Sequence, residues 1–522
     1  MKRRGLLLLP VLVIVFSCSP APEPRRVLML SLDGADAVTL HRLYREGKLA
    51  AGGFERFFRQ GQVAEALIPV NPTITAPNHI SLATGFSTGE TGIVGNWVRL
   101  PGMPLTEKVS GFAAEIGTET LWEAARRQGL RAATSGWPGN DGKGERRTAD
   151  WGMTYTGSPE LNAKLETFPR EAWTGTLREG AWSLIPCSSE RCWSKVLRID
   201  RAGVYSYVGG GYRLHAYPAK FEKALQESGL VWPGPPDGEL LEETWAGRPG
   251  IDLDTWVEQA ERFSTFFMDA LLAAARHSDW NLLMAYTPVI DEAGHELLLV
   301  DPRQPGFTPA RRDEFAAARL RVWQSVDREL ARLLSFVNLR TTTVLLVSDH
   351  GMTPAHTRID ADALLRDWGF AAYADGMGGG GVCKIYLRPD LPDRQKLIDD
   401  LRARFASWSE ENGKPLARVL TAAGAAEIGM SHPNLGDLLL VAEPGYTFRD
   451  EDDPIASVPL SPTTVYGKHG YLNTHASMHA VYLALGRGIK KGNAGRISNL
   501  EVAPRVASWL GIEKPRRQPG IE

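Results

Sequence analysis

The fold is decided by the stretch VLLVSDHGM, residues 344–352. Its four leading apolar residues predict a buried strand of a parallel sheet. A carboxylate and an imidazole follow, Asp349 and His350, and then Gly351, where the chain can turn. In a doubly wound sheet, ligands bind just beyond the carboxyl ends of the strands, which is where this pair would lie. Taken alone, the pair has a second interpretation, a capping aspartate beside an ordinary loop histidine.

Other apolar segments of the chain end in the same way. Residues 26–32 (RVLMLSL) predict a strand followed by Asp33, and residues 281–286 (NLLMAY) predict a strand followed by a loop with Asp291 and His295. Since that Asp and His are four residues apart, one helical turn would point them to the same side. A parallel sheet gathers such loops at one edge. The sequence therefore predicts one shared site from three aspartates and three histidines: Asp33, Asp291, His295, Asp349, His350 and His469.

This set of side chains suits borderline-soft divalent metals such as zinc, which take nitrogen and oxygen ligands and can leave positions open. The ligands divide into two sites, with Asp291, His295 and His469 around one ion and Asp33, Asp349 and His350 around the other. Two ions roughly 4 Å apart can clamp the attacking and leaving oxygens of a phosphoryl transfer. We therefore expect two divalent metal ions, with Zn²⁺ as the expected metal.

Thr75 lies in NPTITAPNH, residues 71–79, where two prolines keep the backbone extended before a predicted helix start. A hydroxyl at such a start faces free backbone N–H groups, which favour a bound phosphate. The alternative role for Thr75 is an N-cap or turn hydroxyl. Beside two metal ions, its lowered pKa would let it attack phosphorus as an alkoxide. Asn96 could donate a hydrogen bond to a non-bridging phosphate oxygen.

The composition is that of an ordinary globular protein. The chain has 522 residues, 43% hydrophobic and 23% charged, with a formal net charge of −2. Nothing in this charge indicates a nucleic-acid-binding surface, so no nucleic-acid partner is expected. Cys187 and Cys192 are five residues apart, and an exported protein could join them in a small disulfide loop. That pairing would leave Cys383 as a buried thiol.

The N-terminus predicts export. Three basic residues precede an apolar run, residues 6–16, which is too short to span a bilayer and is typical of a secretory signal peptide. The sequence VFSC that ends at Cys18 resembles a bacterial lipobox. We therefore expect the protein in the bacterial periplasm or cell envelope, in contact with the membrane only through a lipid on Cys18. Plain secretion is the alternative.

The predicted fold class is α/β, with a doubly wound, mostly parallel central sheet, helices on both faces and an inserted cap. Residues 156–250 are rich in Trp, Gly and Pro and show no clean period, which indicates the insertion. The expected order is a signal peptide (1–17), a tether (18–25), a first core part (26–155), the insertion (156–250), a second core part (251–370), a small subdomain (371–460) and a C-terminal core part (461–522).

These motifs resemble those of the alkaline phosphatase superfamily and, within it, the nucleotide pyrophosphatase/phosphodiesterase (type I phosphodiesterase) family. The resemblance covers most of residues 26–155 and 251–515. It is carried, in the family's order, by Asp33-Gly34, Thr75-Ala76-Pro77-Asn78-His79, Gly95-Asn96, Trp137-Pro138-Gly139, Asp291 with Gly294-His295, Ser348-Asp349-His350-Gly351-Met352, and His469-Gly470-Tyr471. The resemblance implies an alkaline-phosphatase-like fold and a phosphothreonine intermediate on Thr75. It also implies that Thr75 ligates the metal of Asp33, Asp349 and His350, and that Asn96 binds phosphate.

Two departures from the family's pattern bear on the substrate. Ala76 stands where nucleotide-cleaving members carry an aromatic residue, which weakens the case for a nucleotide. The family's His-Gly-x-Asp-Asn is here HGYLN, residues 469–473, so the network around His469 must differ.

We predict an exported hydrolase that cleaves small-molecule phosphate diesters through Thr75. A phosphomonoesterase or phosphonate hydrolase on the same scaffold is the nearest alternative. It would need additional cations, for which Lys143, Arg146 and Arg147 are candidates, although each also fits a solvated surface. A non-catalytic lipoprotein that binds a ligand is an alternative from another class. The complete set of metal ligands and the nucleophile argue against it.

Overall fold

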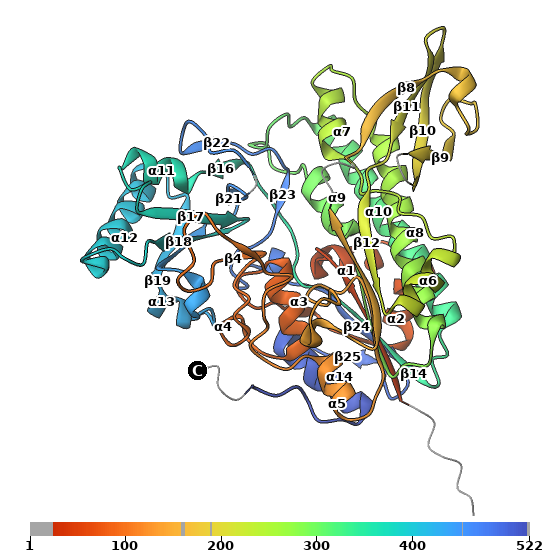
Figure 1. Cartoon of the computed structure of the whole chain (residues 1–522), viewed down its shortest axis with the longest axis horizontal. Helices are drawn as coiled ribbons and strands as arrows, with labels where there is room; N and C mark the ends of the chain where they lie inside the picture. Colours follow the sequence, from red (N-terminus) through yellow and green to blue (C-terminus); the bar gives the residue numbers. More distant parts are fainter. Residues whose placement is uncertain (1–24, 158–161, 188–189, 452, 519–522) are drawn as a thin grey trace, which may run out of the picture.

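The computed structural model describes residues 25–157, 162–187, 190–451 and 453–518. The predicted signal peptide and Cys18 lie outside the described residues. Within the described part, a nine-stranded sheet forms the centre of the molecule (Figure 1). Its strands, in spatial order, are β12 (Tyr212–Tyr217), β7 (Trp151–Gly157), β6 (Ala132–Ser135), β13 (Leu282–Thr287), β1 (Arg26–Leu32), β14 (Thr342–Val347), β24 (Tyr482–Gly486), β2 (Gln62–Val63) and β25 (Gly492–Asn493).

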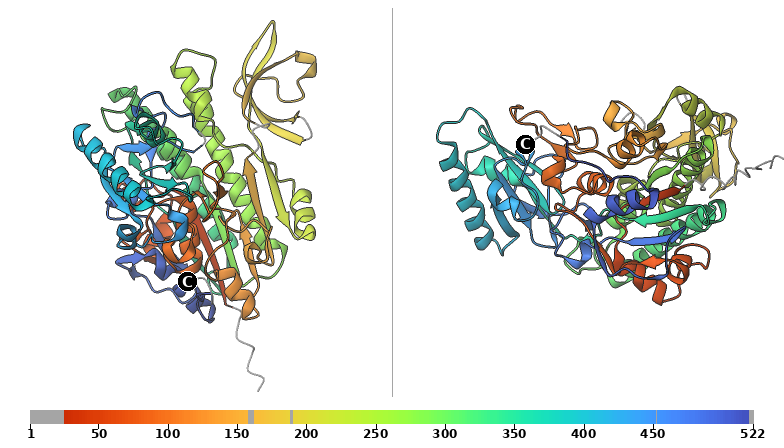
Figure 2. Two further views of the ribbon diagram at one scale, coloured as in Figure 1. Left: turned by 60° about the vertical axis from the view of Figure 1, so that its left-hand side comes forward. Right: turned by 90° about the horizontal axis from the view of Figure 1, so that it is seen from below.

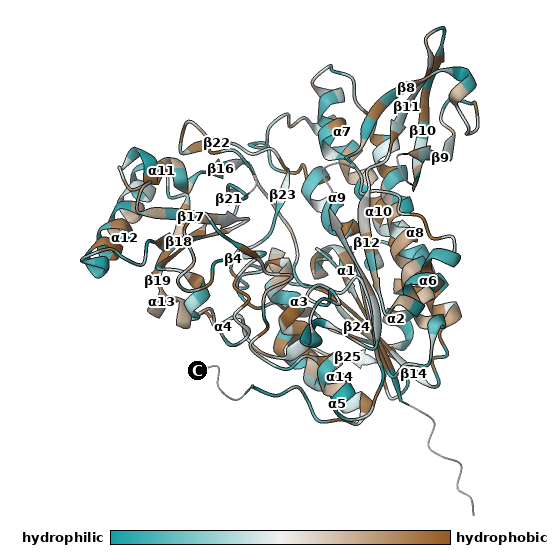
Figure 3. Cartoon of the chain, in the orientation of Figure 1, coloured by the Kyte–Doolittle hydropathy of each residue, from teal (hydrophilic) through white to brown (hydrophobic). Residues whose placement is uncertain are grey.

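The middle of this sheet is parallel. Strands β7, β6, β13, β1 and β14 pair in parallel, whereas β12 and β24 are antiparallel to their inner neighbours. In the central register, Leu30 pairs with Ala285 on one side and with Leu346 on the other. Every residue of β13 and β14 is buried, as expected for strands covered on both faces. Figure 3 shows the apolar character of these central strands.

Helices cover both faces of the sheet. Alternate residues of β1 enter two separate cores, Leu28 and Leu30 on one face and Val27 and Met29 on the other, because strand side chains alternate with a period of two. The first core includes residues of α1 (Ala37–Arg45), α2 (Phe54–Gln60), α6 (Ala219–Glu227), α8 (Leu253–His277) and α10 (Pro309–Phe336). The second includes residues of α3 (Thr75–Thr84), α5 (Leu121–Arg127) and α14 (Val502–Leu510). The predicted α/β fold with helices on both faces is confirmed.

A smaller antiparallel sheet lies at the left of Figure 1. Its strands, in spatial order, are β17 (Ala374–Gly379), β18 (Val382–Leu387), β20 (Leu438–Ala442) and β19 (Leu416–Thr421). Residues of α11 (Ala361–Asp367) and α12 (Arg394–Glu411) share its apolar core, which also buries the thiol of Cys383. This small sheet therefore has its own core beside the main one.

The stretch 156–250 contributes to two sheets. Strand β12 extends the central sheet beside β7. A separate four-stranded sheet projects from the body of the molecule (Figure 2), in the order β8 (Lys164–Phe168), β11 (Gly203–Val208), β10 (Glu190–Asp200) and β9 (Trp182–Cys187). A disulfide joins Cys187 to Cys192 between β9 and β10, with Cα atoms 5.8 Å apart, as predicted. Helix α7 (Gly238–Trp245) follows.

The remaining elements are short. They are the strands β3 (Ala66–Ile68), β4 (Trp97–Val98), β5 (Val109–Ser110), β15 (Thr353–Pro354), β16 (Thr357–Ile359), β21 (Tyr446–Phe448), β22 (Leu460–Pro462), β23 (Gly467–Lys468) and β26 (Arg496–Ser498), and the helices α4 (Thr88–Thr91), α9 (Val289–Leu297) and α13 (Ala422–Ala426). Among the described helices, none combines the length and apolarity needed to cross a bilayer.

Candidate active site

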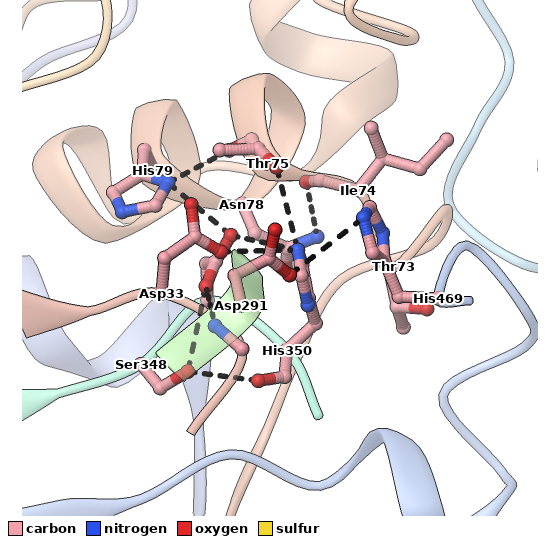
Figure 4. Close-up of polar contacts among 12 residues, drawn as sticks. Asp33, Thr73, Ile74, Thr75, Asn78, His79, Asp291, Ser348, His350 and His469 are labelled. Carbon is pink, nitrogen blue, oxygen red and sulfur yellow. Dashed lines mark hydrogen bonds and ion pairs between the residues drawn. The ribbon is translucent and has the colours of Figure 1, made fainter. Parts of the chain in front are cut away.

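The predicted side chains meet at the carboxyl edge of the three central strands (Figure 4). Asp33 follows β1 directly, and Asp349 and His350 follow β14 after one serine. The other members come from neighbouring elements: Thr75 from the start of α3, Asp291 and His295 from α9, and His469 from the residue after β23. The parallel strands thus bring residues from distant parts of the sequence to one place, as the sequence predicted.

The first predicted metal group is present as a cluster. One ligand atom each of Asp291, His295 and His469 lies within 4.8 Å of the others. His295 Nε2 is 3.2 Å from Asp291 Oδ2, and His469 Nε2 is 4.0 Å from Asp291 Oδ1. Burial raises the pKa of Asp291, but His295, His469 and His350 outweigh it and hold that pKa well below its usual range. The carboxylate is therefore ionised and ready to bind a cation.

The three residues of the second predicted group, Asp33, Asp349 and His350, also lie together, with His350 Nε2 3.4 Å from Asp33 Oδ1. Asp33 and His350 cluster with Asp291 as well, again with ligand atoms within 4.8 Å of one another. Asp349 lies beside them, with Oδ2 3.0 Å from His350 Nε2 and 3.4 Å from His79 Nδ1. Asp291 thus lies between the two groups, and the assignment of each carboxylate to one ion stays a prediction.

The three histidines present the same nitrogen to the carboxylates. In each ring Nδ1 contacts a backbone carbonyl oxygen: His295 to Gly467 at 2.8 Å, His350 to Gly351 at 3.0 Å and His469 to Thr73 at 3.1 Å. Such a contact places the proton on Nδ1 and leaves the Nε2 lone pair for a metal. The contact at Nδ1 therefore fixes the orientation of each imidazole ring, as in metal sites.

The carboxylates of the site are incompletely satisfied. Within the described part of the chain, Asp33 Oδ1, Asp291 Oδ1 and Asp349 Oδ2 are buried and have no hydrogen-bond partner. Burial, together with Asp349 and Asp291, raises the pKa of Asp33 well above its usual range. Buried polar atoms normally have partners, and a divalent cation would serve several of these at once. The oxygen and imidazole donors therefore fit metal ions.

Thr75 is the first residue of α3, and its hydroxyl faces the candidate metal ligands (Figure 4). The N-cap residue is Ile74, so the alternative role of Thr75 as an N-cap is wrong. Thr75 Oγ1 lies 3.4 Å from His350 Nε2, and the residue is only 8% exposed. The hydroxyl thus combines a helix N-terminus with direct contact to the ligand cluster.

Asn78, to which the sequence assigned no separate role, holds the loop before Thr75. Its fully buried amide accepts a hydrogen bond from Val70 N (2.8 Å) and donates to the carbonyls of Pro72 (2.8 Å) and Ile74 (3.1 Å). One side chain therefore fixes the backbone at three residues of the loop that leads into α3. The sequence signal is the position of an amide in the first turn of a helix entered from a proline-containing loop.

His79 and Tyr286 support the site from its other sides. His79 Nδ1 contacts the Thr75 carbonyl at 2.9 Å, and its Nε2 lies 2.8 Å from Ser31 Oγ. Tyr286 donates its hydroxyl to Asp33 Oδ2 at 2.6 Å. The histidine is four residues after Thr75 and so shares its helix face, a signal that the sequence offered. No comparable signal marks the tyrosine.

Asn96 lies next to the start of α3. Its Oδ1 accepts a hydrogen bond from Ala76 N at 2.9 Å, and the side chain is half-buried. Because Oδ1 is engaged, the amide orientation is fixed and Nδ2 is the group that can donate to a ligand. This geometry fits a donor to a phosphate oxygen held at the helix N-terminus.

A cavity of about 1270 Å³ opens beside Tyr286. Aromatic side chains line it, including Trp97, Phe112 and Tyr155. Of the described residues along its wall, Lys143 is the one lysine or arginine. The cavity therefore offers a large, mostly uncharged or acidic surface beside Tyr286, whose hydroxyl contacts Asp33.

Sequence comparisons identify related proteins. The sequence model of the family described as type I phosphodiesterase / nucleotide pyrophosphatase matches residues 27–472. Ectonucleotide pyrophosphatase/phosphodiesterase family member 1 of Homo sapiens is 33% identical over 128 residues, which are 24% of this chain and 13% of that protein. Venom phosphodiesterase 2 of Crotalus adamanteus is 34% identical over 87 residues, 16% of this chain and 11% of that protein. The aligned stretches thus span 13% and 11% of these relatives' lengths.

Solved structures share the fold across nearly the whole chain. Human ectonucleotide pyrophosphatase / phosphodiesterase 5 aligns with a TM-score of 0.54 at 16% identity, covering 94% of this chain and 96% of that one. An inactive variant of the murine protein, in complex with AMP, gives 0.52 at 15%, with coverages of 94% and 96%. Phosphonoacetate hydrolase from Sinorhizobium meliloti 1021, with phosphonoformate, gives 0.54 at 18%, covering 94% and 97%. At these identities the likeness shows the fold alone.

Proposed function

This chain belongs to the type I phosphodiesterase / nucleotide pyrophosphatase family, and from that premise we propose that it is a hydrolase of phosphoric esters that cleaves phosphate diesters through Thr75. The family and the fold class expected from the motifs are confirmed. The proposal adds a reaction type, a nucleophile and two divalent ions, with zinc as the expected metal. The observation that carries it is the placement of the Thr75 hydroxyl at the helix N-terminus, 3.4 Å from His350 Nε2.

The ligand clusters would hold the metal ions. Asp291, His295 and His469 would bind one, and Asp33, His350 and Asp349 the other, with Asp291 adjacent to both. Bound there, two divalent cations would supply positive charge to the transferring phosphoryl group and lower the pKa of the Thr75 hydroxyl. The rest of the chemistry belongs to the chain's own residues.

The reaction would proceed in two displacements at phosphorus. Thr75 Oγ1 forms a bond to phosphorus while the first ester oxygen leaves and takes up a proton, which gives a phosphothreonine that keeps the second ester group. A water oxygen then attacks the same phosphorus, the bond to Thr75 Oγ1 breaks, and the hydroxyl regains its proton. Asn96 Nδ2 would donate to a non-bridging oxygen in both steps. Asn78 and His79 would keep the start of α3 in place.

The cavity favours a diester over a monoester. Its volume of about 1270 Å³ leaves room for the second ester group. A dianionic monoester or a carboxylate-bearing phosphonate would need further cations. Arg146 pairs with Glu123 at 3.2 Å and Arg147 with Asp141 at 3.1 Å. Neither guanidinium group therefore provides an additional cation for the substrate. Lys143 is exposed at the cavity's edge.

A substrate panel on zinc-loaded protein tests this proposal. We expect kcat/KM for bis(p-nitrophenyl) phosphate to exceed that for p-nitrophenyl phosphate about tenfold or more. Thr75→Ala should lower turnover at least ~10³-fold while the protein keeps its metal, whereas Thr75→Ser, which retains a hydroxyl, should keep measurable activity. Preference for the monoester would favour the phosphomonoesterase alternative. Failure to cleave any aryl phosphate with metal bound would favour the non-catalytic binding protein.

We also propose that the protein is exported and carries a lipid on Cys18. The Cys187–Cys192 disulfide supports this, because such bonds persist in oxidising compartments such as the periplasm. Fractionation of cells that express the full chain tests it. The wild type should be recovered with membranes and Cys18→Ser in the soluble periplasmic fraction; identical fractionation of the two would remove the lipid from the account.

A further inference from the structure

Lys384 is a buried lysine in the middle of the small sheet. It lies in β18, where all six residues are buried, and only 4% of its surface is exposed. Lysine is almost never fully buried unless it is paired, because burial of the ammonium group costs several kcal/mol. An apolar side chain of similar length would pack between the paired residues Met377 and Leu439 without that cost. The lysine therefore needs a reason beyond the stability of the sheet.

The ammonium group reaches out of the small sheet to the residues on either side of Asn96. Lys384 Nζ donates a hydrogen bond to the carbonyl oxygen of Trp97 at 2.5 Å. A Cβ atom built on Gly95 would lie 2.5 Å from the same Nζ, so the amine also fills the space that a side chain at residue 95 would need. Gly95 and Trp97 flank Asn96 directly. The lysine thus contacts the backbone on both sides of the candidate phosphate donor.

The lysine is charged when it makes this contact. Burial lowers the pKa of Lys384 to about 8, while Glu451 favours the charged form. At neutral pH the amine is therefore mostly protonated and donates a charge-assisted hydrogen bond, which is stronger than a neutral one. A buried carbonyl held by such a bond has little freedom to move.

Asn96 is consequently held from two directions. On the helix side its Oδ1 accepts from Ala76 N at 2.9 Å. Within its own hairpin of β4 and β5, its carbonyl accepts from Gly111 N at 2.7 Å. The first bond fixes the side-chain amide of Asn96, and the second fixes its backbone carbonyl. Lys384 holds the carbonyl of the next residue, Trp97.

The same hairpin is tied to the small sheet at a second point. Arg99 Nη2 lies 2.8 Å from Asp375 Oδ2 of β17, and its guanidinium group stacks over Tyr386 of β18 at 4.6 Å from the ring centroid. This contact anchors the hairpin as a whole. Lys384 is the contact that reaches the residue next to Asn96.

We propose that Lys384 is a positioning residue that holds Asn96 in place for the phosphoryl group, and that the small sheet thereby acts as a platform for the active site. This inference rests on the proposed function, in which Asn96 donates to a phosphate oxygen. A donor displaced by 1 Å loses much of its effect on the transition state. Burying this charge lowers the stability of the protein. That loss is tolerated because the lysine serves catalysis, as is common at functional sites.

Lys384→Met, measured on zinc-loaded protein with bis(p-nitrophenyl) phosphate, tests the proposal. We expect kcat to fall about 10- to 100-fold with a much smaller change in KM, because the loss falls on the transition state. We expect the Tm to stay equal or to rise, because a buried charge has been replaced by an apolar chain of similar length. In Lys384→Ala, added n-propylamine should restore part of kcat.

Lys195→Met is the matched control. Lys195 is also a buried lysine, 7% exposed, but its Nζ contacts Glu258 at 2.8 Å and Thr255 at 2.9 Å, away from the site. Its loss should lower the Tm and leave kcat/KM unchanged. The proposal is overturned if Lys384→Met keeps wild-type kcat, or if its kcat and Tm fall together as in a merely destabilised protein. A wild type that cleaves no diester would instead overturn the proposed function.

Discussion

Replacing Asn78 with Ala should lower both the stability of the protein and kcat, because this side chain holds the loop before Thr75. The substitution removes the acceptor for Val70 N and the donor to Pro72 O and Ile74 O. The two carbonyls keep other partners, since Pro72 O accepts from Ile74 N and Ile74 O from Asn78 N. One buried N–H, that of Val70, loses its side-chain acceptor.

The expected loss follows from these contacts. Two or three hydrogen bonds at about 0.5–1.5 kcal/mol each, together with one unsatisfied buried N–H at about 1–3 kcal/mol, give a destabilisation between about 2 and 7 kcal/mol. The loop before Thr75 then loses its fixed geometry. We therefore expect kcat to fall more than about tenfold, since small misplacements of a nucleophile are costly. Urea denaturation and steady-state kinetics on bis(p-nitrophenyl) phosphate measure the two effects.

Asn499→Ala is the matched control. The Asn499 amide donates to Asn78 Oδ1 at 3.0 Å but contacts none of the loop residues. It should lose about 1 kcal/mol and keep wild-type kcat. If Asn78→Ala unfolds at the wild-type urea concentration with unchanged kcat, the assigned role of this side chain is wrong.

Three further predictions concern the metals and the substrate. Gly34→Ala should lower both metal content and activity, because Gly34 has φ +67° and an added Cβ would lie 2.7 Å from Asp291 Cα; normal zinc content by elemental analysis would contradict this. EDTA should abolish activity and lower the Tm, and added zinc should reverse both effects. The free energy of unfolding should fall by about 2.7 kcal/mol if zinc had been present at 100 times its Kd, and an unchanged Tm in EDTA would argue against bound metal. Lys143→Ala should leave diester kcat/KM within about twofold, since one exposed charge contributes little; a large loss would assign it to the substrate.

The strand ends were predictable from the sequence because short-range patterns mark them. Continuous apolar runs followed by Asp33 and by Asp349 indicated buried parallel strands. Both strands, β1 and β14, lie in the middle of the sheet, and the two aspartates follow their carboxyl ends. The spacing of Asp291 and His295 predicted a common helix face, and their side chains are 3.2 Å apart.

What the sequence did not indicate depends on contacts between distant segments. The approach of Asp291, on α9, to both Asp33 and His350 is set by side-chain directions on different elements and has no local pattern. Strand β12 pairs with β7 across more than fifty residues, so the membership of part of the 156–250 stretch in the central sheet had no local signal. Lys384 reads as an ordinary strand residue until the fold places the residues around Asn96 against it.

The stereochemical course at phosphorus tests the covalent role of Thr75 most directly. A chiral phosphorothioate aryl diester, hydrolysed by zinc-loaded protein in ¹⁸O-water, gives a product whose configuration can be assigned. Attack by Thr75 followed by attack by water inverts phosphorus twice, so the account predicts net retention. Net inversion would show a single direct attack by water and would contradict it.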